Sequence, residues 1–179
     1  KAGLILNRGK RDCVQIDDPL LLPTREEVYL DRGREAELET GQPVYRGRQV
    51  IGRIAEVGLH TSRLRLLTDD RYRARAALLR ETAEGFQELA EGILRGDGTG
   101  CRLDHVPISI DVQTGDRIFT PRADGAFSSR LYFGTVVQAE RSPGAAHWEI
   151  AVKTPTISLL SGSVQVLRTR LNDHRLLGN

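Results

Sequence analysis

Apolar residues recur along the chain in short runs, many of which alternate with polar residues. The segment Arg63–Asp70, RLRLLTDD, begins with arginine and leucine in alternation, the period of a strand buried on one face. Pro43–Tyr45, a turn at Arg46–Arg48 and Val50–Val57 together predict a hairpin. Further strands are predicted in GLIL, CVQIDD, RIFTPR, FGTVVQAE, HWEIAVKT and SVQVLR. Because glycine and proline separate many short strands, the pattern predicts an all-β fold of barrel or sandwich type.

One segment carries two conflicting signals. Arg71–Gly92, RYRARAALLRETAEGFQELAEG, is rich in Ala, Leu, Glu and Arg, which favour helices. From Tyr72 to Leu78, however, small and apolar side chains occupy every second position, as in a strand. We therefore expect a strand to about Leu79, followed by a short helix or structured loop near residues 82–90.

The chain also contains a weak internal repeat. LETGQPV at Leu38–Val44 parallels VQTGDRI at Val112–Ile118, because in both an apolar residue stands three positions before a Thr-preceded glycine. Each copy is followed by a glycine-led strand, GRIAEV from Gly52 and GTVVQAE from Gly134. The repeat suggests two similar β subdomains in tandem, and chance similarity between β segments is the alternative.

The expected division of the chain follows from this repeat. We place a first β subdomain in residues 1–100 and a second in residues 101–167, each shaped like a small barrel. Residues 168–179 form a polar C-terminal tail. Residues 1–29 contribute strands to the first subdomain.

Composition narrows the classes of function. Hydrophobic residues make up 39% and charged residues 28%, as in an ordinary soluble globular protein. The formal net charge is only +2, so charge gives no support to nucleic-acid binding. No apolar run approaches the ~18 residues of a membrane helix, and no signal peptide is visible. Because the chain starts at Lys1 and contains no Met, we expect it to be part of a longer protein.

The stretch from His60 to Asp70 holds the residue types of a hydrolytic triad. His60 and Ser62 are only two positions apart, which in a strand places their side chains parallel instead of head to head. No Gly-x-Ser-x-Gly motif surrounds Ser62. We therefore expect Thr61 and Ser62 to close a turn. The enzymatic alternative is a two-barrel serine hydrolase that uses His60 with a serine and a carboxylate from elsewhere.

Arg95–His105, RGDGTGCRLDH, contains three incomplete ligand signals. It lacks the spaced acidic ligands of a calcium loop and the Gly-Lys-Ser/Thr of a phosphate loop. Cys101 and His105 lack two further zinc ligands. A glycine-rich turn explains the segment, so we expect no metal and no cofactor. Cys13 and Cys101 allow either one disulfide or two free thiols.

The most unusual apolar stretch is Phe127–Gly134, FSSRLYFG. It is interpreted either as a strand that enters the core or as a loop that displays aromatic side chains to a partner. Under the second interpretation, Leu131, Tyr132 and Phe133 are the candidate partner-binding residues.

These segments together resemble the extracytoplasmic β region of the rod-shape-determining protein MreC family. LDRGREAELETGQPV is similar to the family's Asp-Lys-Gly-Ser turn and the Gly-Val-x-x-Gly-Met-Pro-Val element after it. VIGRIAEVGLHTSRLRLLTD resembles Leu-Val-Gly-Arg-Val, Val-Gly-x-x-x-Ser and a strand ending Leu-Leu-Thr-Asp. GILRG, DVQTGDRIFT, GTVVQAE and VKTP follow in the family's order. The resemblance spans about Leu30 to Leu167.

The chain departs from the family pattern at several loops. Thr120-Pro121-Arg122 stands at the usual Thr-Ser-Gly, and Ser128-Ser129-Arg130 at the usual Pro-x-Gly. Glu37 stands at a usual glycine. The resemblance therefore identifies the chain as a divergent member whose loop surfaces differ from those of its relatives.

The resemblance implies a non-enzymatic, periplasmic scaffold of the cell-elongation complex, without a cofactor. Members of the family are anchored by a membrane helix upstream of a coiled coil and two β subdomains. The implied partners are a second copy of the chain, MreB, MreD, RodA and an elongation-type penicillin-binding transpeptidase. The resemblance implies no contact with nucleic acid, and contact with the membrane only through a segment absent from this chain. A serine hydrolase and a nucleic-acid-binding β-barrel remain the alternatives.

Overall fold

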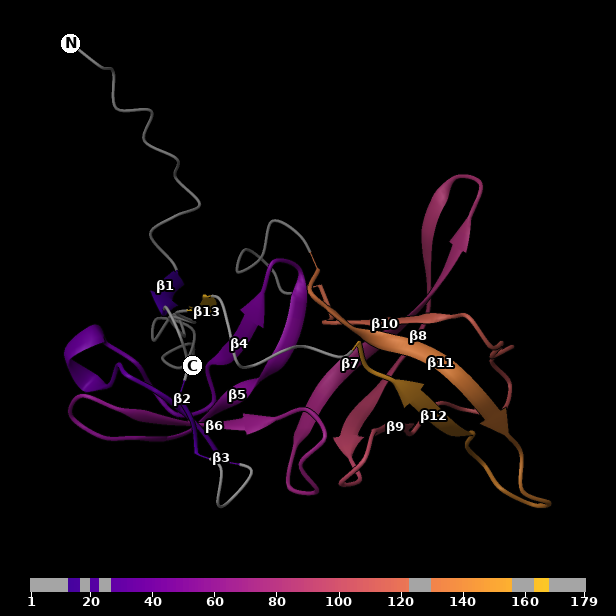
Figure 1. The fold of residues 1–179 in the computed structure, drawn as a ribbon. Coiled ribbons are helices and arrows are strands. Elements are labelled where there is room, and N and C mark those ends of the chain that lie inside the picture. Colours follow the sequence, from indigo (N-terminus) through magenta and orange to yellow (C-terminus); the bar gives the residue numbers. More distant parts are fainter. Residues whose placement is uncertain (1–12, 17–19, 23–26, 123–129, 156–162, 168–179) are drawn as a thin grey trace, which may run out of the picture.

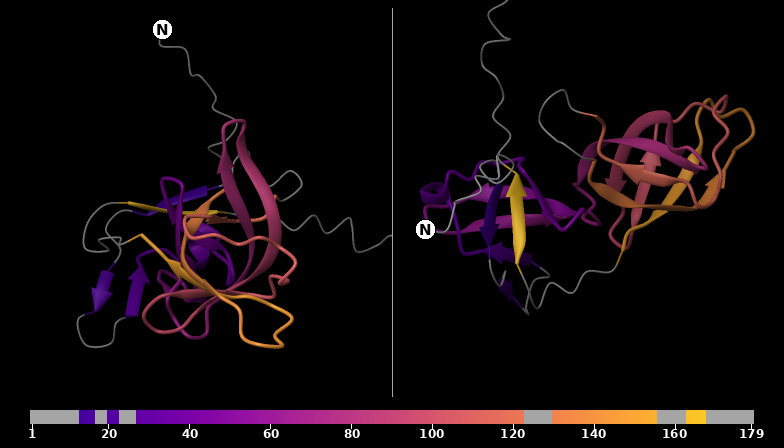
Figure 2. Two further views of the ribbon diagram at one scale, coloured as in Figure 1. Left: turned by 90° about the vertical axis from the view of Figure 1, so that its right-hand side faces the viewer. Right: turned by 90° about the horizontal axis from the view of Figure 1, so that it is seen from above.

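The computed structural model describes residues 13–16, 20–22, 27–122, 130–155 and 163–167. Their strands form two lobes (Figure 1; Figure 2). The predicted strand GLIL, residues 127–129 of FSSRLYFG and the predicted polar tail lie outside the described residues.

The first lobe is an open antiparallel sheet that contains both ends of the described chain. Its strand order is β1–β13–β4–β5–β6–β3–β2. The strands are β1 (Cys13–Ile16), β2 (Leu20–Leu22), β3 (Glu27–Leu30), β4 (Pro43–Arg46), β5 (Gln49–Val57), β6 (Ser62–Leu66) and β13 (Val164–Leu167). The chain therefore leaves this lobe after β6 and returns to it in β13.

The second lobe is a closed antiparallel barrel. Its strands are β7 (Arg73–Thr82), β8 (Gly85–Gly96), β9 (Cys101–Asp104), β10 (Arg117–Phe119), β11 (Tyr132–Glu140) and β12 (Glu149–Lys153). Pairing runs β7–β8–β9–β12–β11–β10 and back to β7, so the ring has no free strand. Closure removes the exposed edges that an open sheet leaves.

The all-β prediction is confirmed, and the predicted hairpin of the first lobe is observed as β4 and β5. The regular helix within the described residues is a single 3₁₀ turn at Arg34–Ala36. The turn before β6 allows Gly33 to approach Gly58, where a Cβ on Gly33 would lie 2.4 Å from the Gly58 carbonyl oxygen. Glycine is therefore required where these two loops meet.

The predicted short helix near residues 82–90 is wrong. This segment is the tip of the β7–β8 hairpin, in which Thr82 pairs with Gly85 and the tip projects beyond the barrel (Figure 1). The Thr82 hydroxyl donates to the Gly85 carbonyl at 2.8 Å, and Gly85 has a φ of +118° that suits glycine. The segment forms a hairpin despite its helix propensity, because a helix would break the cross-strand pairs that place Leu78 in the barrel core.

The internal repeat is confirmed as a shared turn and strand arrangement. Gly41 donates to the Ile54 carbonyl at 2.8 Å, and Gly115 donates in the same way to the Val136 carbonyl at 2.9 Å. Ile54 and Val136 in turn donate to the carbonyls of Gln42 and Asp116 at 2.9 and 2.8 Å. The bulge that follows Ile54 in β5 has its counterpart after Val136 in β11. Strands β4–β5–β6 and β10–β11–β12 are therefore two copies of one unit.

Two main hydrophobic clusters fill the lobes. The first-lobe cluster consists of Ile16, Val28, Leu30, Leu38, Val44, Ile51, Ile54, Leu64, Val164 and Val166. The barrel cluster includes Leu67, Tyr72, Leu78, Leu94, Leu103, Ile118, Phe133, Val136, Trp148 and Ile150. These clusters favour a boundary between the lobes near Leu67. The predicted boundary after residue 100 would instead separate β8 from β9, which are paired strands of one barrel. The division into subdomains stays a prediction.

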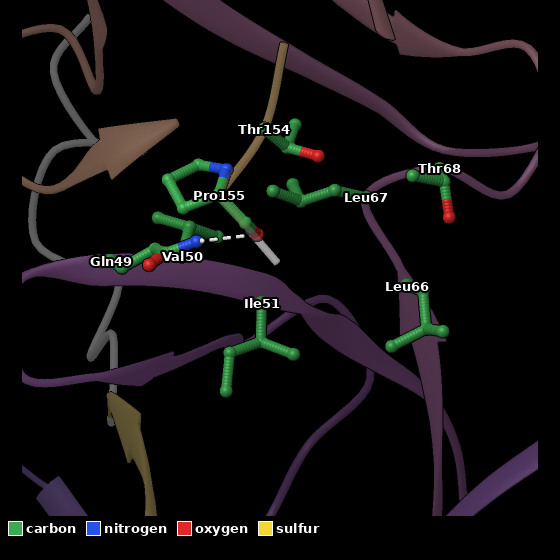
Figure 3. A pocket seen from close by; sticks show the side chains of 8 residues that line it. All are labelled: Gln49, Val50, Ile51, Leu66, Leu67, Thr68, Thr154 and Pro155. Atoms are coloured by element: carbon green, nitrogen blue, oxygen red, sulfur yellow. Dashed lines mark hydrogen bonds between the residues drawn. The ribbon is translucent and has the colours of Figure 1, made fainter. Parts of the chain in front are cut away.

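The lobes meet along β5 and the start of β11. Tyr132 pairs in parallel with Gln49, and the Tyr132 N–H donates to the Arg48 carbonyl at 2.7 Å. Close by, the Gln49 side-chain amide donates to the Pro155 carbonyl at 3.2 Å (Figure 3). These contacts border a small, mainly apolar pocket lined by Gln49, Val50, Ile51, Leu66, Leu67, Thr68, Thr154 and Pro155 (Figure 3). The two lobes thus share an interface formed by both backbone and side chains.

Candidate partner-binding surface

The structure places the predicted contact residues Leu131, Tyr132 and Phe133 at the start of β11. Leu131 and Phe133 are buried in the barrel cluster, as a strand that enters the core predicts. Thr120 fixes Leu131 by accepting its N–H at the side-chain hydroxyl (3.0 Å) and donating its own N–H to the Leu131 carbonyl (2.8 Å). Tyr132 alternates to the outer face and is half-buried. Contact of these three residues with a partner stays a prediction, for which Tyr132 is the accessible member.

Tyr132 belongs to a row of aromatic rings on the outside of the barrel. The Phe119 ring lies 5.3 Å from the Tyr132 ring and 5.4 Å from the Phe86 ring, centroid to centroid. Strand register produces this row, because Phe119 pairs with Tyr132 on one side and with Ala77 on the other. Phe119 also forms a small third cluster with Ala77 and Leu79, against which Tyr132 packs. A barrel needs no apolar cluster on its outer surface, so this one requires an explanation.

Phe86, at the tip of the β7–β8 hairpin, is the exposed end of the row. It is 46% exposed, whereas Phe119 is 8% exposed. We call Leu79, Phe86, Phe119 and Tyr132 the outer aromatic patch. An exposed aromatic ring next to buried ones is the arrangement that binding hot spots use, because a partner can complete the burial.

Charged side chains border the outer aromatic patch. Arg117 stacks over the Phe86 ring at 5.3 Å and forms an ion pair with Glu81 at 2.6 Å. Arg130 forms a second ion pair with Glu88. The first pair links the hairpin to β10, and the second links it to the residues just before β11. A polar rim around an apolar centre is the usual anatomy of a protein interface.

A further arginine anchors the base of the hairpin. The Arg80 guanidinium donates to both carboxylate oxygens of Asp116 at 2.8 Å, and to the Asp111 carboxylate at 3.0 Å. The hydrogen bond from Arg80 lowers the pKa of Asp111, and a second one from Gln113 adds to this effect. Arg80 therefore joins β7 to the turn before β10 and positions the outer aromatic patch.

The candidate triad residues do not come together. His60 is 73% exposed in the turn between β5 and β6, and its Nδ1 lies 3.8 Å from a Glu35 carboxylate oxygen. Ser62 is buried, and its hydroxyl has no hydrogen-bond partner among the described residues. A nucleophilic serine needs a hydrogen bond to its base, so His60 and Ser62 do not form a catalytic pair. The turn itself is observed, because the Gly58 N–H donates to the Thr61 carbonyl at 2.7 Å, but the predicted role of the Ser62 hydroxyl in closing it is not, since Ser62 begins β6.

The glycine-rich segment forms a turn between β8, which ends at Gly96, and β9, which begins at Cys101, as expected. The Asp97 carboxylate accepts the N–H groups of Gly100 at 2.7 Å and of Thr99 at 3.1 Å. These two hydrogen bonds lower the pKa of Asp97. Within the described part of the chain, no group of three or more His, Cys, Asp or Glu side chains could hold a metal ion.

Cys101 is a free, buried thiol that donates to the Leu67 carbonyl with a sulfur–oxygen distance of 3.3 Å. Burial raises the pKa of this thiol to about 12. Its environment therefore keeps the thiol protonated, which makes it unreactive. Of the two alternatives left by the sequence, the structure has the free thiol at Cys101.

The fold is all-β: a closed barrel joined to an open sheet, with an aromatic patch on the barrel wall. The family model for "Rod shape-determining protein MreC, barrel core" matches residues 21–159. This chain therefore belongs to the MreC family. That family consists of structural proteins that determine cell shape and not of enzymes.

Relatives and solved structures agree with this assignment. The cell shape-determining protein MreC of Haemophilus influenzae is 32% identical over 136 residues, which are 76% of this chain and 37% of that protein. MreC of Escherichia coli is 29% identical over 105 residues, 59% of this chain and 27% of that protein. The chain thus spans little more than a third of these relatives at most.

Two solved structures share the fold. A Listeria MreC structure has a TM-score of 0.72 at 20% identity and covers 88% of this chain and 75% of its own. A complex between penicillin-binding protein PBP2 and MreC from Helicobacter pylori has a TM-score of 0.65 at 15% identity and covers 88% and 99%. None of the helices in the described residues of the present chain is long and apolar enough to span a bilayer.

Proposed function

We propose that this chain is the periplasmic, partner-binding part of a membrane-anchored scaffold in the cell-elongation complex, which directs lateral peptidoglycan synthesis. Membership of a cell shape-determining family supports the cellular role. The outer aromatic patch carries the binding role, because Phe86 is exposed beside two packed aromatic rings.

The proposed partner is an elongation-type penicillin-binding transpeptidase. A relative of the same fold has been solved in complex with PBP2. Aromatic and arginine side chains are enriched at interface hot spots, and the outer aromatic patch combines Phe86 and Tyr132 with Arg117 at its rim. The scaffold acts by binding one conformation of its partner more tightly than the other. MreB, MreD and RodA are further proposed members of the complex.

Binding of the chain to the transpeptidase of the same organism, followed by biolayer interferometry, tests this role. Phe86→Ala and Tyr132→Ala are each expected to weaken binding by about tenfold or more, the range of an interface hot spot. Val137→Ala is the matched control, because Val137 is 47% exposed and lies on the same strand as Tyr132. Unchanged binding in both patch variants would remove the patch from the interface. A wild-type chain that does not bind would refute the proposed partner.

We also propose that the chain self-associates. Relatives of the same fold include the major periplasmic domain of a cell shape-determining filament, with a TM-score of 0.70. Sedimentation velocity over a range of protein concentrations is the direct measurement. A mean mass that rises with concentration is expected, whereas a constant monomer mass would count against self-association.

A further inference from the structure

Four arginines gather where β5 and β6 meet the turn that leads into β7. Arg53 and Arg65 stand directly opposite each other in the register of the two strands. Arg71 lies in the turn and Arg73 begins β7. We call these four residues the arginine cluster. None of its members belongs to the outer aromatic patch, and the inference is independent of the proposed function.

Backbone carbonyls hold two of these arginines in place. Arg53 donates to the Arg73 carbonyl at 3.1 Å, and its guanidinium stacks over the Tyr72 ring at 5.4 Å. Arg73 donates to the carbonyls of Asp70 and Tyr72, both at 2.7 Å. Carbonyls orient a guanidinium without neutralising its charge. The positive groups are therefore preorganised but not neutralised by these contacts.

Arg65 is the least satisfied member. Its Nε is buried and has no hydrogen-bond partner among the described residues. The Asp69 carboxylate forms an ion pair with Arg65 at 3.8 Å, which is too long for a hydrogen bond, and its Oδ1 already accepts the Arg71 N–H at 2.8 Å. The acidic residue nearest along β5, Glu56, forms an ion pair with Arg63. The only other carboxylate of the turn is the exposed Asp70, so positive charge exceeds negative charge here.

This arrangement costs stability unless an anion is bound. Like charges directly opposite on antiparallel strands repel each other, and a buried donor without an acceptor is unfavourable. An oxyanion would relieve both costs. A phosphate group offers several oxygens and so can engage more than one guanidinium fork, whereas a single carboxylate is filled by one.

We propose that the arginine cluster binds a phosphate-ester anion. Two sources share this chemistry: the headgroup of an anionic phospholipid and a phosphate ester free in solution. Arg65 supplies a guanidinium on a side chain that is 20% exposed, and Arg53 supplies a fork that stacks on Tyr72. Arg71 and Arg73 add charge at the rim.

Thermal unfolding in increasing inorganic phosphate, at ionic strength held constant with sodium chloride, tests the site. The melting temperature of the wild type is expected to rise and to saturate. Arg53→Gln and Arg65→Gln are each expected to weaken the apparent phosphate affinity by about tenfold, the loss of one charged hydrogen bond. Arg65→Lys keeps the charge without the fork and should also weaken it. Arg75→Gln, which removes one positive charge at an exposed pair with Glu91, should respond like the wild type.

Flotation with phosphatidylglycerol vesicles, compared with neutral phosphatidylcholine vesicles, distinguishes the two sources. Saturable binding of phosphate alone supports a soluble ester, and binding to phosphatidylglycerol vesicles supports a lipid headgroup, provided that Arg53→Gln weakens either one. Melting in the absence of phosphate reports whether each variant folds. Should Arg65→Gln unfold, Arg53→Gln and the exposed Arg71→Gln decide the question. A response to neither probe, or an equal loss in Arg75→Gln, would overturn the site.

Discussion

Arg80 donates two hydrogen bonds to the buried carboxylate of Asp116, from Nε to Oδ1 and from Nη2 to Oδ2, each at 2.8 Å. The Asp116 side chain is only 3% exposed, and its second oxygen also accepts the Gln113 N–H at 2.8 Å. This contact ties β7 to the turn before β10, beside the β7–β10 pairing that closes the barrel.

Loss of Arg80 should destabilise the chain strongly. Arg80→Met leaves Asp116 buried without its cation, which is expected to lower the free energy of unfolding by about 3–5 kcal/mol. Arg75→Met breaks an exposed ion pair with Glu91 and is expected to cost less than about 1 kcal/mol. Urea denaturation of both variants provides the comparison. Equal losses would mean that the Arg80–Asp116 pair is energetically an ordinary surface pair.

Alkaline pH should expose the burial of Cys101. The fold raises the pKa of this thiol to about 12, above the 9.0 of a free thiol. The stabilisation is therefore complete below pH 9 and is lost as pH rises toward 12, because the unfolded thiol ionises first. The free energy of unfolding should fall by up to about 1.4 kcal/mol per pH unit on account of this group.

Cys101→Ala is the variant that isolates this effect. Urea denaturation over about one pH unit on either side of the free-thiol pKa measures the effect. Over this range, the free energy of unfolding of Cys101→Ala should change less with pH than that of the wild type. Cavity formation lowers its stability at every pH and so does not mimic the effect. Parallel pH profiles of wild type and variant would show that Cys101 does not contribute.

Two equivalent glycines should resist substitution. A Cβ on Gly52 would lie 2.0 Å from the Arg65 carbonyl oxygen, and one on Gly134 would lie 2.5 Å from that of Lys153. Gly52→Ala and Gly134→Ala are each expected to cost about 1–3 kcal/mol or more, because backbone must move. Gly100→Ala, whose Cβ would have its nearest neighbour at 3.8 Å, is the control, and its melting temperature should change little. Alanine tolerated at both repeat positions would contradict the close strand approach.

Substitution of Phe119 should lower stability strongly, whereas substitution of Phe86 should affect mainly partner binding. Phe119→Ala is expected to cost about 3–5 kcal/mol, because its ring is buried between Phe86 and Tyr132. Phe86→Ala removes a ring that is nearly half exposed and should cost much less. Thermal denaturation measures both variants. A similar loss in each would indicate that Phe86 serves folding and not a partner.

Local patterns predicted much of the fold. The β4–β5 hairpin follows from alternation and turn residues, and the repeat of Gly41 and Gly115 follows from matching turns. The prediction for the segment after Leu79 failed because its composition favours a helix, whereas its residues pair with one another across a tight turn, Thr82 with Gly85 and Arg80 with Gln87. Propensity contains no information about those partners.

The surfaces were harder to predict than the strands. Phe86, Phe119 and Tyr132 form a row only because of strand register, and register is fixed by contacts distant in sequence. Tyr132 was found through its apolar neighbourhood, but the same signal also selected Leu131 and Phe133, which the barrel buries. The pairing of Arg53 with Arg65 across β5 and β6 likewise depends on a bulge in β5, which no residue pattern predicts.

The return of the chain to the first lobe in β13 has a mechanical consequence. Any force that separates the lobes is shared by two covalent crossings, one after β6 and one after β12. A load on one lobe therefore reaches the other through two chain connections instead of one.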